Sequence, residues 1–181
     1  GGIDGSLALR QRGGDLLLAD DLQAQQISLA ADTGSVVLRG ARLDARAPAG
    51  GAVTLAAGNG LQLDAGSRID ASGQRTAAAG ANNGGDVLLS TVRGRLALAP
   101  GGRVDAGGDD DGDGRIVLRA PRGADGRSVA IDPLDAGALR AGDVALEAVQ
   151  VYRQVSVGGV SRDITSIGAA RSALAGSGAA R

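Results

Sequence analysis

The chain has 181 residues, of which 43% are hydrophobic and 32 are glycine; it has one tyrosine and no Phe, Trp, Met, Cys or His. Its net charge is −1, from 19 basic and 20 acidic residues. This composition excludes a disulfide framework, a thiolate metal site and any Ser/His or Cys/His catalytic pair. The basic residues are arginines without a continuous stripe, and stacking aromatics are missing, so no nucleic-acid binding is predicted.

Short segments with apolar residues at alternate positions recur about every 8 to 12 residues, which is the signature of β-strands. Glycine, Asn, Asp and Ser lie between them and are typical of tight turns. Residues 74–83 interrupt the rhythm and are predicted to form a protruding loop. In chain order, the predicted strands are 7–9, 16–18, 27–29, 36–38, 53–55, 61–63, 87–89, 96–98, 116–118, 129–131 and 144–146.

A longer repeat lies over the short one. Residues 50–73 align with residues 84–108, so that Val53 matches Val87 and Ile69 matches Val104. Strands this short do not make a stable sandwich, whereas coiling stacks like residues on like inside a narrow core. The sequence therefore predicts an all-β fold, a parallel β-solenoid (β-helix) with two or three strands per coil.

The solenoid is predicted to occupy residues 1–157, and residues 158–181 form a Gly/Ala-rich tail that serves as a cap or a linker. The chain starts within the repeat, so we expect it to belong to a longer protein. No stretch approaches the roughly 20 consecutive apolar residues that a membrane-spanning helix needs. We therefore expect no membrane span.

One acidic cluster resembles a metal-binding loop. Asp109, Asp111 and Asp113 are followed by Gly114, as in the first half of a calcium-binding loop, where alternating carboxylates converge on one cation. Ala120 stands where the complete loop would need Glu, so this is not an EF-hand. The alternative is a solvated acidic turn, and calcium is the one metal that the sequence leaves open.

Four aspartates, Asp44, Asp64, Asp70 and Asp105, recur in the phrase apolar-Asp-Ala. They could serve as the carboxylates of a polysaccharide-cleaving solenoid, or as corner residues that accept backbone N–H groups on successive coils. Their regular recurrence favours the corner role, and no catalytic residue or cofactor is predicted. Convergence of Asp70, Asp105 and two arginines on one coil face would favour the enzyme.

The phrases GGAVTLAA, GSRIDASG, GGDVLLST and GGRVDAGG, and the stretch from residue 114 to 152, resemble filamentous-haemagglutinin-like exoproteins over residues 1–157. This resemblance implies a right-handed parallel β-helix in the shaft of a large secreted bacterial adhesin without enzymatic activity. It also implies export by a separate outer-membrane transporter of the two-partner type. At the bacterial surface, the shaft would mediate adhesion to an unidentified receptor or present a distal effector. A β-helical polysaccharide-active enzyme and a calcium-stabilised solenoid module are the alternatives.

Overall fold

The structure is a computed structural model that describes residues 3–74, 83–108, 113–123, 125, 127–149, 154–157 and 160–163. It divides into two compact units, residues 1–149 and 150–181. The second unit contains an antiparallel pair of strands, β15 (Gln154–Val157) and β16 (Val160–Asp163). The sequence placed the boundary between solenoid and tail after residue 157, and most of that tail lies outside the described residues.

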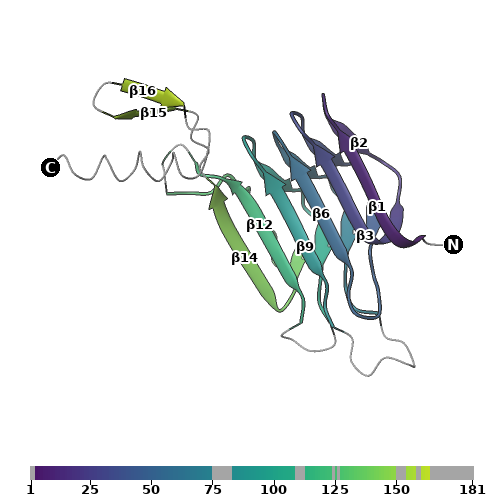
Figure 1. Cartoon of the computed structure of the whole chain (residues 1–181). Coiled ribbons are helices and arrows are strands. Elements are labelled where there is room, and N and C mark those ends of the chain that lie inside the picture. Colours follow the sequence, from purple (N-terminus) through teal and green to yellow (C-terminus); the bar gives the residue numbers. More distant parts are fainter. Residues whose placement is uncertain are drawn as a thin grey trace. The chain divides into compact units, whose positions relative to one another are not determined.

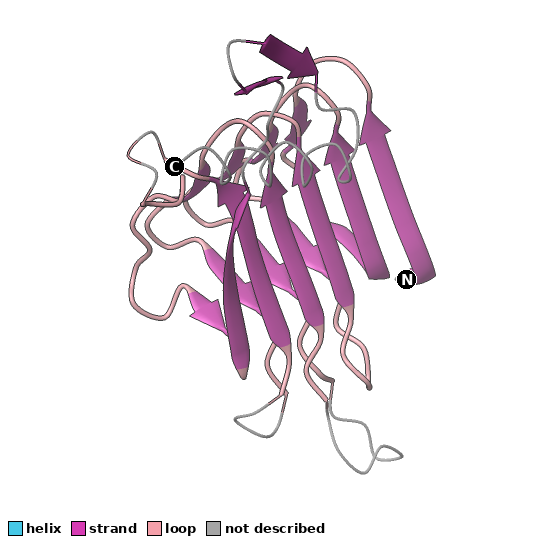
Figure 2. Cartoon of the chain, turned by 60° about the vertical axis from the view of Figure 1, so that its left-hand side comes forward, coloured by secondary structure: helices cyan, strands magenta, loops and turns pink. Residues whose placement is uncertain are grey.

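The first unit is all-β, and its strands pair in parallel in three columns (Figures 1 and 2). The first column contains β1 (Ile3–Gln11), the second part of β3 (Leu22–Ala31), β6 (Ala52–Ala57), β9 (Asp86–Thr91), β12 (Arg115–Pro121) and β14 (Asp143–Val149). The second column contains β2 (Leu16–Leu18), β4 (Val36–Leu38), β7 (Leu61–Leu63) and β10 (Leu96–Leu98). The third contains the first part of β3, β5 (Arg42–Asp44), β8 (Arg68–Asp70), β11 (Arg103–Asp105) and β13 (Leu139–Arg140).

Strand β3 joins two of these columns. Its first residues, Leu22 and Gln23, pair with β5, and Gln26–Ala31 pair with β6. The first and third columns therefore belong to one ten-stranded sheet, and the second column is a separate four-stranded sheet. The chain passes through the three columns in turn and returns to the first, which confirms the all-β, solenoid-like architecture predicted from the sequence.

The repeat found in the sequence corresponds to one coil. Val53 pairs with Val87 and Ile69 with Val104, as the alignment of residues 50–73 with 84–108 predicts. Coil length nevertheless varies, since Leu7 pairs with Ile27, only 20 residues further along the chain. Most of this variation in coil length lies in the crossing, the connection that leads from a strand of the third column back to the first column.

The core is built from rows of identical or similar aliphatic residues. Leu29, Leu55 and Leu89 follow one another in register in the first column and are fully buried. Comparable rows run through the second column (Val36, Leu61, Leu96 and Leu38, Leu63, Leu98) and the third (Leu43, Ile69, Val104). These side chains fill a narrow interior without aromatics, which is why the composition can omit them.

Tight corners require glycine at defined positions. A Cβ atom added to Gly85 would collide with the carbonyl oxygens of Ala71 and Gly51, and one added to Gly51 with that of Ala45. Successive coils therefore approach each other at this corner as closely as their backbones permit.

One strand prediction is wrong. Residues 129–131 form no strand but only isolated bridges, Leu96 with Ile131 and Arg122 with Val129. The longer connection between β12 and β13 leaves this segment one bridge to the second column, in which Leu96 exchanges backbone hydrogen bonds with Ala130 and Asp132. Within the described ranges there is no helix of the length and hydrophobicity needed to cross a membrane.

Candidate functional site

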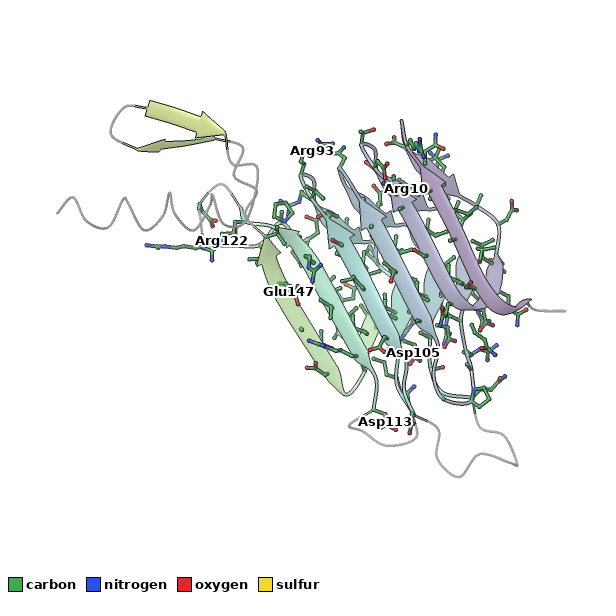
Figure 3. The ribbon with its side chains drawn as sticks, in the orientation of Figure 1. Arg10, Arg93, Asp105, Asp113, Arg122 and Glu147 are labelled. Carbon is green, nitrogen blue, oxygen red and sulfur yellow. The ribbon has the colours of Figure 1, made fainter. Side chains whose placement is uncertain are left out.

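Three aspartates from three successive coils lie one above another on the outer side of the third column. Asp44, Asp70 and Asp105 are the last residues of β5, β8 and β11, and they are in register with one another. The residue before each is buried in the core, so strand alternation turns each aspartate away from the core. We call these three residues the carboxylate ladder (Figure 3 labels Asp105).

Each carboxylate of the ladder accepts the backbone N–H group two residues further along the chain. This local bond fixes the turn that leaves the third column. The pairs are Asp44 Oδ1 with Arg46 N at 3.3 Å, Asp70 Oδ1 with Ser72 N at 3.3 Å, and Asp105 Oδ1 with Gly107 N at 3.0 Å. The corner role favoured by the sequence is thus seen for these three aspartates.

Guanidinium groups bridge the rungs of the ladder. Arg42 Nη2 lies 3.3 Å from Asp44 Oδ2 and 3.4 Å from Asp70 Oδ2. Arg68 Nη2 lies 3.4 Å from Asp70 Oδ2 and 3.9 Å from Asp105 Oδ2. Each of these arginines therefore neutralises two carboxylates that belong to different coils.

Two further arginines close the ladder at its ends. Arg46 Nη2 lies 2.7 Å from Asp44 Oδ2, and Arg140 Nη1 lies 3.1 Å from Asp105 Oδ1. Arg140 is in register with Asp105 and so occupies the next rung, where a fourth aspartate would add to the repulsion.

The electrostatics around Asp44 favour an ionised carboxylate. Adjacent strands are spaced by about 4.8 Å, so unscreened aspartates on successive rungs would repel one another. The hydrogen bond and charge of Arg46 hold the pKa of Asp44 below its usual range, against the opposing effect of burial. Asp70 has a side chain only 4% exposed and receives the Ser72 hydroxyl at 2.6 Å. The lowered pKa of Asp44 is the reverse of what a general acid needs, a carboxyl held protonated by its surroundings.

Asp70 and Asp105 do converge with arginines on one coil face, because Arg68 contacts both. This is the arrangement that would be expected of an enzyme. Its chemistry differs from that expectation, since the carboxylate oxygens are engaged by guanidinium and backbone donors. The group of residues is suited to holding coils together rather than to transferring a proton.

Asp64 belongs to the same sequence phrase but not to the ladder. It follows β7 in the second column, and its Oδ1 accepts a hydrogen bond from Gln62 Nε2 at 2.6 Å. Residues 63–65 and 69–71 share the pattern apolar-Asp-Ala, yet they lie at different corners of the coil. The pattern alone does not distinguish the two positions.

The candidate calcium loop lies mostly outside the described residues. Asp109 and Asp111 are not among them, and Asp113 is described only at the edge of the segment, where its carbonyl oxygen accepts the Gly142 N–H at 2.7 Å. Among the described residues, no three acidic side chains are grouped so that they could hold a metal ion. The predicted loop at 74–83 is likewise described only at its ends.

Two aspartates outside the apolar-Asp-Ala phrase also join coils. Asp15 Oδ1 accepts the N–H of Ser35, and Asp21 Oδ1 that of Arg42, each at 2.7 Å and each from the following coil. Asp15 comes just before the short apolar strand β2, and Asp21 comes just before the longer strand β3. Arg140 also had a signal, since it replaces Asp in a further apolar-x-Ala phrase.

Two hollows on the outer faces of the described strands are not lined by any residue of the ladder. One of about 470 Å³ runs along the second column beside Val37, Gln62 and Ala97, and the ion pair of Arg95 with Asp132 lies across it. Another, of about 250 Å³, lies on the first column beside Thr54 and Leu88. Two carboxylates line each hollow, Asp15 and Asp132 the first and Asp86 and Glu147 the second. One of each pair is bound by an arginine, Asp132 by Arg95 and Glu147 by Arg119.

No protein-family model matches the chain, and neither does any curated protein or solved structure that was compared with it.

Proposed function

We propose that this chain is a structural and adhesive shaft segment of a large secreted bacterial adhesin of the filamentous-haemagglutinin type, and that it has no catalytic activity. The observation that carries the proposal is the register of the first column, which continues without a shift from residues 6–11 of β1 to β14. A shaft needs a repeated unit that lengthens without changing its cross-section, and coil-on-coil stacking supplies it.

The polar residues support the same role. The carboxylate ladder and its arginines connect β5, β8, β11 and β13 across successive coils. On the first column, Arg119 and Glu147 pair across β12 and β14 in the same way, with Nε and Oε2 2.7 Å apart. Charges on this rod are therefore used mainly between coils, which strengthens it along its axis.

The coils wind in a right-handed sense, because parallel strands joined by a crossover connection take that hand almost without exception. The protein is exported to the bacterial surface through an outer-membrane transporter of the two-partner type, and the shaft carries adhesive contacts or a distal effector away from the cell. These features come from the resemblance of the repeat phrases. The solenoid-like architecture is compatible with them.

Surface labelling tests the location and the transporter together. Antibodies raised against the 181-residue chain should label intact bacteria that make the full-length protein, and deletion of the partner transporter gene should abolish the labelling. Permeabilised cells provide the control for expression. Labelling that appears only after permeabilisation in both strains would contradict the proposal.

Adhesion needs a separate measurement. Beads coated with the folded chain should attach to host epithelial cells or to bacteria, and soluble chain should compete. Beads coated with the Gly85→Val variant serve as the matched control, because the collision at Gly85 disrupts the coil corner while leaving the composition almost unchanged. Equal attachment of both bead types would argue against an adhesive role for the folded rod.

The second candidate is an enzyme acting on a polysaccharide, favoured by the shared contact of Arg68 with Asp70 and Asp105. Release of reducing ends or unsaturated uronates from a panel of acidic polysaccharides would reveal it. If such an activity disappeared in Asp105→Asn and persisted in Asp64→Asn, with both variants folded, the non-catalytic proposal would be overturned.

A further inference from the structure

Asparagine is followed by glycine twice in the chain, as Asn59-Gly60 and as Asn83-Gly84. The backbone nitrogen of the residue after an asparagine can attack the side-chain amide, and glycine obstructs this approach least because it has no side chain. Both asparagines are exposed to solvent. Exposure therefore does not distinguish the two dipeptides, and a difference in their reactivity has to come from how their backbones are held.

Asn59-Gly60 is held by hydrogen bonds to the coils on both sides. The Asn59 N–H donates to the Gly34 carbonyl oxygen at 2.9 Å, and the Asn59 carbonyl oxygen accepts the Gly94 N–H at 3.1 Å. The hydroxyl oxygen of Ser35 accepts the side-chain amide of Asn59 and the N–H of Gly60, each at 3.3 Å. The attacking nitrogen and the amide that it would attack are therefore both engaged by Ser35.

Asn83-Gly84 lacks these restraints. Among the residues that the structure describes, neither Asn83 nor the N–H group of Gly84 makes a hydrogen bond. The first N–H group after Asn83 that is bound to a neighbouring coil belongs to Gly85, which donates to the Ala106 carbonyl oxygen at 2.8 Å. Intramolecular attack is fast when the reacting atoms can come within about 3–3.5 Å in the right direction. Asn83 can rotate toward that geometry without breaking a hydrogen bond, whereas Asn59 would have to break several.

We propose that the Asn83-Gly84 peptide is a modification site, where the folded chain converts Asn83 to aspartate and isoaspartate without an enzyme. Hydroxide removes the proton of the Gly84 nitrogen, which bonds to Cγ of Asn83 while the side-chain NH₂ takes up a proton from water and leaves as ammonia. Water then opens the succinimide ring. Breaking the bond from Cγ to the nitrogen gives aspartate, and breaking the bond from the backbone carbonyl carbon to the nitrogen gives isoaspartate. Nothing is oxidised or reduced, and the inference does not depend on adhesion.

Either product places a new negative charge beside a tightly packed corner. A Cβ atom added to Gly84 would lie 2.4 Å from the Ala106 carbonyl oxygen and 2.4 Å from the Gly114 nitrogen, so the backbone has no spare space there. Asp113, labelled in Figure 3, comes directly before Gly114, and Asp86 comes shortly after Gly84, so the new carboxylate adds to charges of the same sign. Isoaspartate also lengthens the backbone by one CH₂ group directly before Gly84. The modification therefore loosens the corner that leads into β9.

The test incubates the full 181-residue chain at mildly alkaline pH in water enriched in heavy oxygen, and mass spectrometry then locates the label. Trypsin separates the two dipeptides because Arg68 and Arg75 lie between them. The same incubation in concentrated urea gives the rate in the unfolded chain, so the ratio of the folded rate to the unfolded rate removes the effect of the neighbouring sequence. This ratio should be at least about tenfold higher for Asn83 than for Asn59, because Asn59 has to give up several hydrogen bonds before it reacts.

Two variants make the test specific. Ser35→Ala removes the oxygen that engages Asn59 and Gly60, so it should raise the folded rate at Asn59 severalfold and leave the rate at Asn83 unchanged. Asn83→Ser removes the reactive amide and is the control for stability. After the incubation, the urea midpoint of the wild type should be lower than before, and that of Asn83→Ser should be unchanged. Circular dichroism verifies the fold of each variant at the start.

Three results would overturn the proposal. A folded chain that takes up no label at Asn83 would show that the site does not react. Equal ratios for Asn83 and Asn59 would show that the hydrogen bonds around Asn59 do not select between the two dipeptides. A urea midpoint that stays constant while Asn83 is converted would show that the corner accommodates the product.

Discussion

The carboxylate ladder predicts that two aspartates with the same sequence phrase differ in their contribution to stability. Asp70→Asn should destabilise the protein much more than Asp64→Asn, although both changes remove one charge and keep the shape of the side chain. Asp70 is nearly buried beside Arg42 and Arg68, whereas Asp64 accepts one hydrogen bond from Gln62.

The magnitude follows from the contacts of each oxygen. In Asp70→Asn, the amide oxygen can keep the Ser72 bonds, but the amide NH₂ then faces two guanidinium donors. Loss of a hydrogen bond to a buried charged group costs about 1.5–3 kcal/mol. The arginine side chains are 39% and 44% exposed, and solvent weakens their share of this interaction, so we expect about 2 kcal/mol. Asp64→Asn should stay within about 0.5 kcal/mol.

Urea unfolding at neutral pH, followed by circular dichroism, measures both variants. With a slope of about 2 kcal/mol/M, the midpoint of Asp70→Asn should fall by about 1 M, and that of Asp64→Asn should hardly move. Equal shifts for the two variants would refute the assignment of Asp70 to a ladder between coils. An unchanged slope verifies that the comparison concerns stability rather than the extent of unfolding.

The remaining predictions concern the corners and the pH dependence. Gly85→Ala should cost about 3 kcal/mol, because its Cβ meets backbone atoms of two coils, whereas Gly13→Ala has open space and should be close to neutral in thermal unfolding. Deletion of residues 75–82 shortens the connection between β8 and β9 from fifteen residues to seven, which is the length of the connection between β5 and β6. The free energy of unfolding, measured in urea, should therefore change by less than about 1 kcal/mol. Asp44 has a pKa lowered by Arg46 in the folded state, so its stabilising effect is complete above its usual pKa of about 3.9 and disappears as the pH falls through the lowered value. Asp44→Asn should accordingly flatten the loss of stability on acidification.

A different result would contradict each of these three predictions. Equal melting temperatures for Gly85→Ala and Gly13→Ala would show that the corner is looser than its backbone contacts imply. Loss of cooperative unfolding after the deletion would show that the segment 75–82 contributes to folding. If the stability of Asp44→Asn fell with decreasing pH as steeply as that of the wild type, groups other than Asp44 would cause the acid sensitivity.

The sequence predicted the coil because the same physical constraint acts on every turn. Val53 and Val87 occupy equivalent places in a narrow core, so both must be aliphatic, and the spacing between them became visible as a repeat. The first coil lacked such a signal. Leu7 and Ile27 are separated by only 20 residues, and the sequences around them have no repeat phrase in common. Periodicity thus detects coils of similar length and misses those whose crossings differ.

The site was predictable only in part, for a related reason. That Asp70 accepts a backbone N–H group follows from its residue type and its place after a short strand. That Arg42 and Arg68 flank it depends on stacking residues from three coils, which no local pattern contains. Likewise, Asp64 could not be separated from Asp70 before the columns were known.

The unequal lengths of the coils have a mechanical consequence. If an anchored rod of this kind is pulled from one end, as in flowing liquid, its coils detach in sequence, because each contacts only its neighbours. The coil that separates Leu7 from Ile27 would release 20 residues, about 70 Å of extended chain, whereas the one that separates Val53 from Val87 would release 34, about 120 Å. The molecule would lengthen in steps of different size and dissipate force at each one, so variation in the crossings would tune how a tether yields under load.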